Sequence, residues 1–99
     1  MSEEFALRRA MNTASRVKAI LEDELVAGAL DAIEAELRAE WESSQPDDSA
    51  SRENAYRMLR AAKAFRQRFQ KVIDDGAVAR AVLDSNEAQQ RRARETEHD

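Results

Sequence analysis

Apolar residues recur at helical spacing in the first half of the chain, in two runs that are out of phase. The first run follows Leu7, Met11, Ala14, Val17 and Leu21, and the second follows Val26, Leu30, Ile33, Leu37 and Trp41. The five-residue step from Leu21 to Val26 breaks the 3.6-residue period across the acidic stretch EDE. The pattern predicts a short helix over about residues 3–22 and a second over about 24–43, with a single bent helix as the alternative.

A third apolar run has the spacing of a coiled-coil seam. It passes through Ala55, Met58, Ala62, Phe65, Phe69, Val72, Gly76, Ala79 and Leu83, in steps that alternate between three and four residues. This run predicts a helix over about residues 48–83, with the seam centred near Met58, Phe65 and Phe69. Gly76 lies on the seam, where it either allows a close backbone approach or marks a local break.

Polar segments separate and end these helices. The stretch SSQPDDSAS at 43–51 holds Pro46, which disfavours helix at the residue before it, and Asp48, a suitable N-cap. After Leu83 the sequence DSNEAQQRRARETEHD has no apolar face. Residues 84–99 are therefore expected to be a frayed helix or a disordered tail.

Composition agrees with an all-α fold. The chain has 99 residues, with two Gly and one Pro, and Ala, Glu, Arg and Leu are abundant. We expect one domain over residues 1–83, formed by the short N-terminal helix and a long antiparallel helical hairpin. A single copy of this size buries little apolar surface, so we expect self-association into a homo-oligomeric helical bundle.

The sequence excludes several classes of protein and site. Without Cys there is no disulfide framework and no thiolate metal site. The N-terminus lacks the apolar stretch of a secretory signal, and no run approaches the roughly 18 apolar residues of a membrane span. We therefore expect a soluble, cytoplasmic protein that does not enter a membrane.

Support for catalysis or for a cofactor is weak, and we expect neither. The one His, His98, lies in the predicted tail, so no His-based triad or metal cluster is available. A carboxylate-rich stretch holds Glu34, Glu36, Glu40 and Glu42. We interpret it as a solvated acidic face and predict no metal site, with a carboxylate-only metal site as the alternative.

Charge is distributed unevenly along a chain whose net charge is −4. Residues 1–43 hold five basic and ten acidic residues, whereas residues 57–71, RMLRAAKAFRQRFQK, hold six basic residues and no acidic one. This basic block is the main functional clue. It either binds an anionic ligand or forms a solvated face that pairs with the acidic first part of the chain.

One face of the third helix combines a ring with cations. Tyr56, Arg60, Lys63 and Gln67 share this face, and Arg52 lies a turn earlier. A ring that stacks on a base, beside cations that hold phosphates, is a sequence-tolerant way to bind nucleotides. The alternative for Tyr56 is a place at the edge of the core, and we interpret Trp41 as a packing anchor.

Residues 41–83 resemble a family of small phage proteins, the anti-CBASS sponges, which sequester the cyclic oligonucleotide messengers of bacterial immunity. The resemblance rests on Trp41, on Ser44 and Pro46 with Asp48, on RENAY at 52–56, and on GAVARAVL at 76–83. It implies a helical protomer, a homo-oligomer that is a hexamer in the family, and binding without hydrolysis in the cytoplasm of an infected bacterium.

The resemblance also implies ligands and further site residues. Family members hold cyclic dinucleotides between protomers, and some hold cyclic trinucleotides at separate sites. The dinucleotide site uses an aromatic residue and a lysine from the N-terminal region, which makes Phe5 and Lys18 candidates here, with Arg8 and Arg9 nearby. Two alternatives stay open: a phage assembly or DNA-packaging accessory, although DNA is not the expected partner, and a general helical interaction module.

Overall fold

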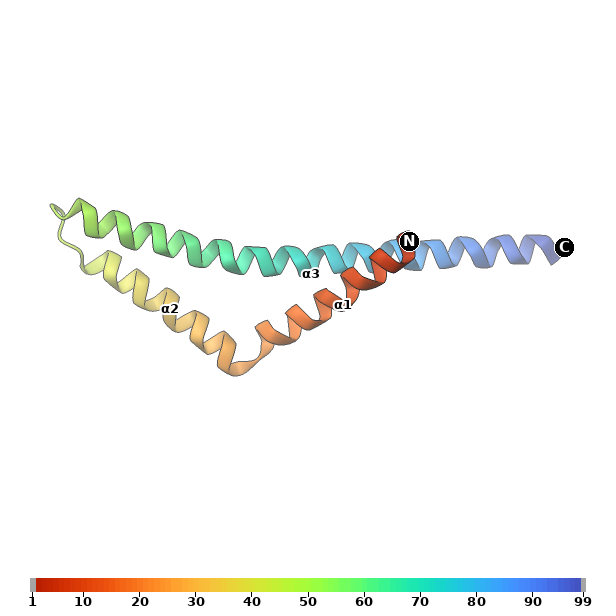
Figure 1. Cartoon of the computed structure of the whole chain (residues 1–99), viewed down its shortest axis with the longest axis horizontal. Coiled ribbons are helices and arrows are strands. Elements are labelled where there is room, and N and C mark those ends of the chain that lie inside the picture. The colour runs from red at the N-terminus through yellow and green to blue at the C-terminus, as the bar shows by residue number, and fades with distance from the viewer. Residues whose placement is uncertain (1, 99) are drawn as a thin grey trace. The chain divides into compact units, whose positions relative to one another are not determined.

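The part of the protein that the structure describes is all-helical and forms three helices. The computed structural model describes residues 2–98, and among these residues there is no strand. The helices are α1 (Glu3–Glu22), α2 (Glu24–Ser43) and α3 (Ser49–His98), which Figure 1 shows in chain order. No helix among the described residues combines the length and the apolar character needed to cross a bilayer.

Asp23 separates α1 from α2, so the alternative of one bent helix is wrong. Its backbone is extended, with φ −61° and ψ 126°, and its carboxylate accepts hydrogen bonds from the N–H groups of Leu25 (3.0 Å) and Val26 (3.1 Å). These are free donors at the first turn of a helix, so Asp23 is the N-cap of α2. The phase break in the apolar pattern coincides with this cap.

The connection between α2 and α3 is closed by side-chain caps at both of its ends. The Ser44 hydroxyl donates to the Trp41 carbonyl at 2.6 Å and ends α2. At the start of α3, the Asp48 carboxylate accepts from the Ser51 N–H at 3.1 Å. These bonds satisfy backbone groups that a helix end leaves without partners. Trp41 therefore lies at the end of α2, a few residues before α3 begins.

α3 continues without a break to His98, beyond the end near Leu83 that we predicted, so of our two alternatives for the residues after Leu83 the disordered tail is wrong. Residues 84–98 are rich in Ala, Gln, Arg and Glu, which have high helix propensity, and extending an existing helix needs no new nucleation. The missing apolar face shows only that these residues have little to pack against. Met1 and Asp99, the first residue of the expected domain and the last of the expected tail, lie outside the described residues.

The contacts of the chain divide it into two compact units where the sequence suggests one domain. Unit 1 comprises Met1–Lys18 and Lys71–Asp99, and unit 2 comprises Ala19–Gln70. Each unit therefore has its own small set of packed residues. α3 contributes its first part to unit 2 and its second part to unit 1.

Small side chains form the core of unit 1. Ala14 and Val17 of α1 and Ala79 and Leu83 of α3 are its buried apolar residues. Gly76 is buried between them, and a Cβ placed on it would overlap the Cβ of Ala14. Gly76 thus allows α1 and α3 to approach closely, and α3 is unbroken at this position. Of the two alternatives for Gly76, the close backbone approach is confirmed and the local break is wrong.

Unit 2 packs along part of the seam that we predicted on α3. Ala55 is buried, and Leu59, Ala62, Arg66 and Phe69 are partly buried. Met58 and Phe65, placed at the centre of the predicted seam, are half exposed. The predicted seam is therefore confirmed at Ala55, Ala62 and Phe69, and it is wrong at Met58 and Phe65 because it followed apolar residues only. An arginine takes an inward position instead.

Arg66 holds that position through two carboxylates of α2. Its Nη2 lies 2.8 Å from the Asp31 Oδ1, and its Nε donates to the Glu34 Oε1. The hydrogen bond to Glu34 is the largest cause of the raised Arg66 pKa, so this guanidinium stays charged. Pairing gives a partly buried cation the partners that make its burial tolerable.

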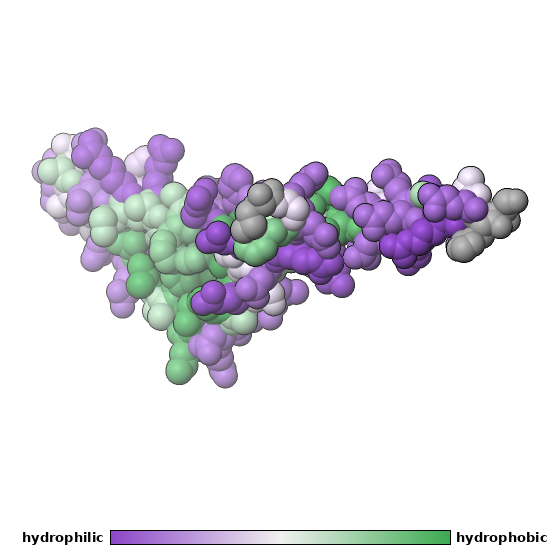
Figure 2. All heavy atoms as spheres, turned by 45° about the vertical axis from the view of Figure 1, so that its right-hand side comes forward, coloured by the Kyte–Doolittle hydropathy of each residue, from purple (hydrophilic) through white to green (hydrophobic). Residues whose placement is uncertain are grey.

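Unit 2 also leaves an apolar groove open to solvent. This groove, called the apolar groove below, has a volume of about 360 Å³. Its lining consists of Ile20, Leu21, Leu25, Val26, Ala29, Leu30, Phe65 and Phe69. The Phe65 and Phe69 rings meet edge to face, with centroids 4.8 Å apart. Figure 2 shows hydrophobic atoms on the surface, in contrast to the hydrophilic C-terminal part of α3.

Candidate functional site: an aromatic–arginine surface

Tyr56 and Arg60 form the first part of the candidate site. They lie one turn apart on α3, and the Arg60 guanidinium carbon is 5.9 Å from the centre of the Tyr56 ring. This is a cation–π arrangement at an exposed place, with 51% of Tyr56 open to solvent. Tyr56 is therefore half exposed, with Arg60 beside its ring, and it lies on the surface of α3.

Trp41 and Arg52 repeat the arrangement across the turn between α2 and α3. The Arg52 guanidinium carbon lies 5.6 Å from the centre of the Trp41 ring, which is 39% exposed. The α2 cap and the Asp48 cap together place these two residues opposite each other. We call Trp41, Arg52, Tyr56 and Arg60 the aromatic–arginine surface.

A shallow pocket is bordered by three residues of this surface, Trp41, Arg52 and Tyr56. It has a volume of about 350 Å³, and its lining consists of Trp41, Pro46, Ser49, Arg52, Glu53 and Tyr56. Both aromatic residues of the surface thus border one space, which falls within the volume range of small-molecule sites. Our interpretation of Trp41 as a packing anchor missed this role. The sequence shows only that Trp41 and the RENAY segment lie on either side of the Pro46 turn, and the contact between them depends on the two caps.

Lys63 and Gln67 extend the site along α3. Helical spacing places them on the face of Tyr56 and Arg60, and both are exposed. Lys63 forms no ion pair with any residue that the structure describes, so its ammonium group can bind an anion. The structure thus brings Arg52, Tyr56 and Arg60 together, with Lys63 and Gln67 on the following turns.

Half of the basic block is engaged in ion pairs. Arg57 binds Glu53 at 2.7 Å and Lys71 binds Asp75 at 2.9 Å, both within α3, and Arg66 binds α2. Pairing with the acidic first part of the chain, one of our two interpretations of the block, therefore describes Arg66. Arg60 and Lys63 stay on the exposed face, and they keep the other interpretation open.

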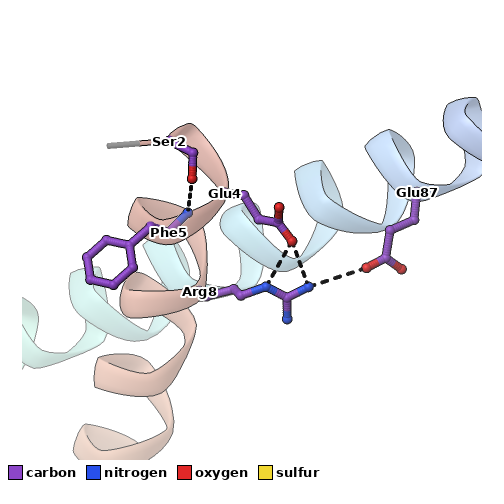
Figure 3. Close-up of polar contacts among 5 residues, drawn as sticks. All are labelled: Ser2, Glu4, Phe5, Arg8 and Glu87. Atoms are coloured by element: carbon purple, nitrogen blue, oxygen red, sulfur yellow. Dashed lines mark hydrogen bonds and ion pairs between the residues drawn. The ribbon is translucent and has the colours of Figure 1, made fainter.

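The N-terminal candidates Phe5, Arg8 and Lys18 belong to unit 1. The Arg8 Nη2 lies 3.0 Å from the Glu4 Oε1 and 3.6 Å from the Glu87 Oε1 of α3, as Figure 3 shows. The Phe5 ring points away from this contact and borders a pocket of about 370 Å³ with Arg9. The predicted site residues therefore fall into two groups, one in each unit.

The chemistry available on the aromatic–arginine surface is noncovalent binding. Aromatic faces accept planar rings, and guanidinium and ammonium groups accept phosphate or carboxylate. Among residues 2–97, no group of three or more His, Cys, Asp or Glu could hold a metal ion. The chain matches no protein-family model, no curated protein and no solved structure.

Proposed function

We propose that this protein binds cyclic oligonucleotides and sequesters them without hydrolysis. The single observation that carries the proposal is the aromatic–arginine surface, on which two exposed rings each lie beside a guanidinium group, 5.6 and 5.9 Å from its carbon. Bases stack on such rings, and phosphates bind such cations. A cyclic dinucleotide offers two bases and two phosphates, and the site offers two rings with several cations beside them.

Residues of the surface and of its extension along α3 have separate roles in this proposal. Trp41 and Tyr56 supply stacking area for bases, and Arg60 and Lys63 hold the phosphates. Gln67 is a hydrogen-bond partner for a ribose or a base edge. The resemblance of residues 41–83 to the anti-CBASS sponges supports the same ligand class, and with it a phage protein that withholds messengers from bacterial CBASS defence.

The proposal includes self-association. Unit 2 exposes the apolar groove together with Met58, and Leu25 within the groove is 84% open to solvent. Exposed apolar patches of this kind mark association surfaces. A homo-oligomer of antiparallel helical hairpins, a hexamer if the resemblance holds, would cover the groove and could repeat the aromatic–arginine surface around a symmetric assembly.

The test is retention and release of a messenger. The purified protein is incubated with a panel of cyclic dinucleotides and cyclic trinucleotides, freed of unbound ligand and heated, and the released compound is identified by chromatography. Recovery of an intact messenger supports sequestration. Recovery of a linear product would show that the protein is an enzyme. If no messenger is retained at concentrations well above that of the protein, the proposal fails.

Two other functions predict different results in the same material. A DNA-packaging accessory would bind duplex DNA with an affinity that falls steeply as salt rises, because each phosphate contact releases counterions. A helical interaction module would self-associate through the apolar groove and retain neither messenger nor DNA. The engagement of Arg57, Arg66 and Lys71 in ion pairs leaves few cations for duplex DNA, and this favours the messenger.

A further inference from the structure

We propose that Glu53 makes the aromatic–arginine surface selective for guanine, so that the messenger it takes is a guanine-containing cyclic dinucleotide. This inference rests on the proposed function and names the ligand of the same site. Glu53 is the one carboxylate among the six residues that line the pocket, which Trp41 and Tyr56 also line. A base stacked on either ring turns its edge, and not its face, toward the pocket wall.

Arg57 prepares the Glu53 carboxylate for this role. Its Nη2 donates to the Glu53 Oε1 at 2.7 Å, one turn along α3. The pair restrains the carboxylate and offsets its charge, which would otherwise repel the phosphates of a ligand. Among the described residues, no hydrogen bond reaches the Glu53 Oε2, and a carboxylate oxygen has lone pairs for more than one donor. Glu53 therefore keeps acceptor capacity for a ligand in the pocket that it lines.

Guanine has the edge that fits two carboxylate oxygens. Its N1–H and N2–H₂ groups are adjacent donors, so it can give one hydrogen bond to each oxygen of Glu53. Adenine places an acceptor, N1, beside its amino group and would set a lone pair against the carboxylate. A site that reads hydrogen-bond donors rejects a ligand that lacks them far more strongly than an apolar pocket rejects a change of size.

Arg52 supports the same choice from the Trp41 side. Its guanidinium carbon lies over the Trp41 ring, 5.6 Å from the ring centre, and Arg52 lines the same pocket as Glu53. Arginine binds the O6 and N7 acceptors of guanine in a bidentate manner. Adenine carries a donor in place of O6. With Glu53 and Arg52 in one pocket, guanine finds an acceptor for its donors and a donor for its acceptors.

The experiment compares three cyclic dinucleotides that differ only in the base edge. Cyclic di-GMP carries all the groups named above, cyclic di-IMP lacks the 2-amino group, and cyclic di-AMP reverses the pattern. Affinities are measured by calorimetry and by quenching of Trp41, the only tryptophan of the chain. The proteins are the wild type, Glu53→Gln, and the control Glu36→Gln, which makes the same change at an exposed position of α2.

We expect the wild type to bind cyclic di-GMP at least about tenfold more tightly than cyclic di-AMP, with cyclic di-IMP between them. Glu53→Gln should lose this preference, and Glu36→Gln should keep it. Equal binding of all three ligands by the wild type would overturn the selectivity and leave sequestration standing. A preference that survives in Glu53→Gln would also overturn the role of Glu53. Binding of none of the three, nor of any other messenger, would remove both proposals.

Discussion

Tyr56, Arg60 and Lys63 are exposed, so each can be changed without loss of packing. If they hold a messenger, Arg60→Ala and Lys63→Ala should each weaken binding by about tenfold to a hundredfold, the effect of one charge-assisted contact. Tyr56→Ala should remove stacking worth about 1–3 kcal/mol. The melting temperature without ligand should stay close to that of the wild type. Calorimetry and thermal melts on the same samples measure both quantities.

Arg68→Ala is the matched control for these variants. Arg68 is an exposed cation of the same basic block, and helical spacing places it on another stripe of α3. The Arg68→Ala variant should therefore bind the messenger with the same affinity as the wild type. Unchanged affinity in the Arg60 and Lys63 variants together with a lowered melting temperature would show that the face is structural. A loss of binding only on changing Arg8 or Lys18 would move the site to unit 1.

Asp48 makes the start of α3, and with it the pocket wall, sensitive to acid. Hydrogen bonds from the Ser51 hydroxyl and then from the Ser51 N–H hold the pKa of Asp48 below its ordinary value of 3.8. A lowered pKa in the folded state means that Asp48 stabilises the fold above that ordinary value. The contribution is lost as the pH falls through the lower pKa of the folded state.

The expected result is a loss of helix at the start of α3 below about pH 3.8, in the range where Asp48 takes up its proton. Asp48→Asn keeps an N-cap that does not titrate. This variant should have a less stable start of α3 at neutral pH, and its helix content should change less between pH 6 and pH 2. Circular dichroism between pH 2 and pH 6, together with backbone NMR of residues 49–52, measures the effect. Identical acid profiles of the two proteins would refute it.

The residues of the site were only partly predictable from the sequence. Helical spacing alone puts Tyr56, Arg60 and Lys63 on one face, because these residues share one continuous helix. Trp41 was missed because its partnership with Arg52 depends on how two caps set the turn between α2 and α3. Such a cross-turn contact is a matter of three-dimensional geometry, which residue spacing does not contain.

At the scale of the helices, the close approach at Gly76 gives a sharp test. Gly76→Ala should destabilise the protein by about 1–3 kcal/mol, because the new Cβ would overlap the Cβ of Ala14 and force two backbones apart. This cost should exceed the gain in helix propensity. Adding Ala14→Gly should restore part of the loss by removing the opposing methyl group. Chemical denaturation of the single and double variants measures this coupling.

Gly28→Ala provides the matched control for that experiment. Gly28 lies within α2, and no atom lies within 4 Å of a Cβ placed there. The same substitution should therefore stabilise the protein by about 0.5–1 kcal/mol, the ordinary gain of alanine over glycine in a helix. If Gly76→Ala stabilised the protein as well, the close approach of α1 and α3 would be wrong.

The helices themselves were more predictable than their packing. The phase break and the Pro46 turn locate α1, α2 and the start of α3, since caps and breakers act on their own neighbours in sequence. The inward position of Arg66 was not predictable from apolar periodicity, because its two acidic partners lie on another helix. The helical residues after Leu83 were missed because propensity, and not an apolar face, keeps that part of α3 helical.

At the scale of the whole molecule, we predict an obligate oligomer. Light scattering at micromolar concentration should give a mass well above the 11.2 kDa of one chain. Leu25→Asp should reduce it, because Leu25 lines the apolar groove and is 84% exposed, so that the change costs a single chain little packing. Phe69→Asp should both break the assembly and lower stability, because Phe69 is partly buried.

Val78→Asp is the control for assembly. Val78 is also largely exposed, at 63%, but it belongs to unit 1 and does not line the apolar groove. The Val78→Asp variant should assemble to the same mass as the wild type. A wild-type mass of a single chain would contradict self-association, and equal dissociation of the Leu25 and Val78 variants would contradict the choice of surface.

The composition of unit 1 from both ends of the chain has a consequence for the order of folding. Contacts in unit 2, such as Trp41 with Arg52, close a short loop, whereas the approach of Arg8 to Glu87 closes almost the whole chain. Short loops cost less entropy, so unit 2 should form early and unit 1 late. In stopped-flow experiments Gly76→Ala should then mainly speed unfolding. During synthesis α1 is made before α3, so the apolar residues of α1 stay exposed to solvent until residues as late as Leu83 have been synthesised.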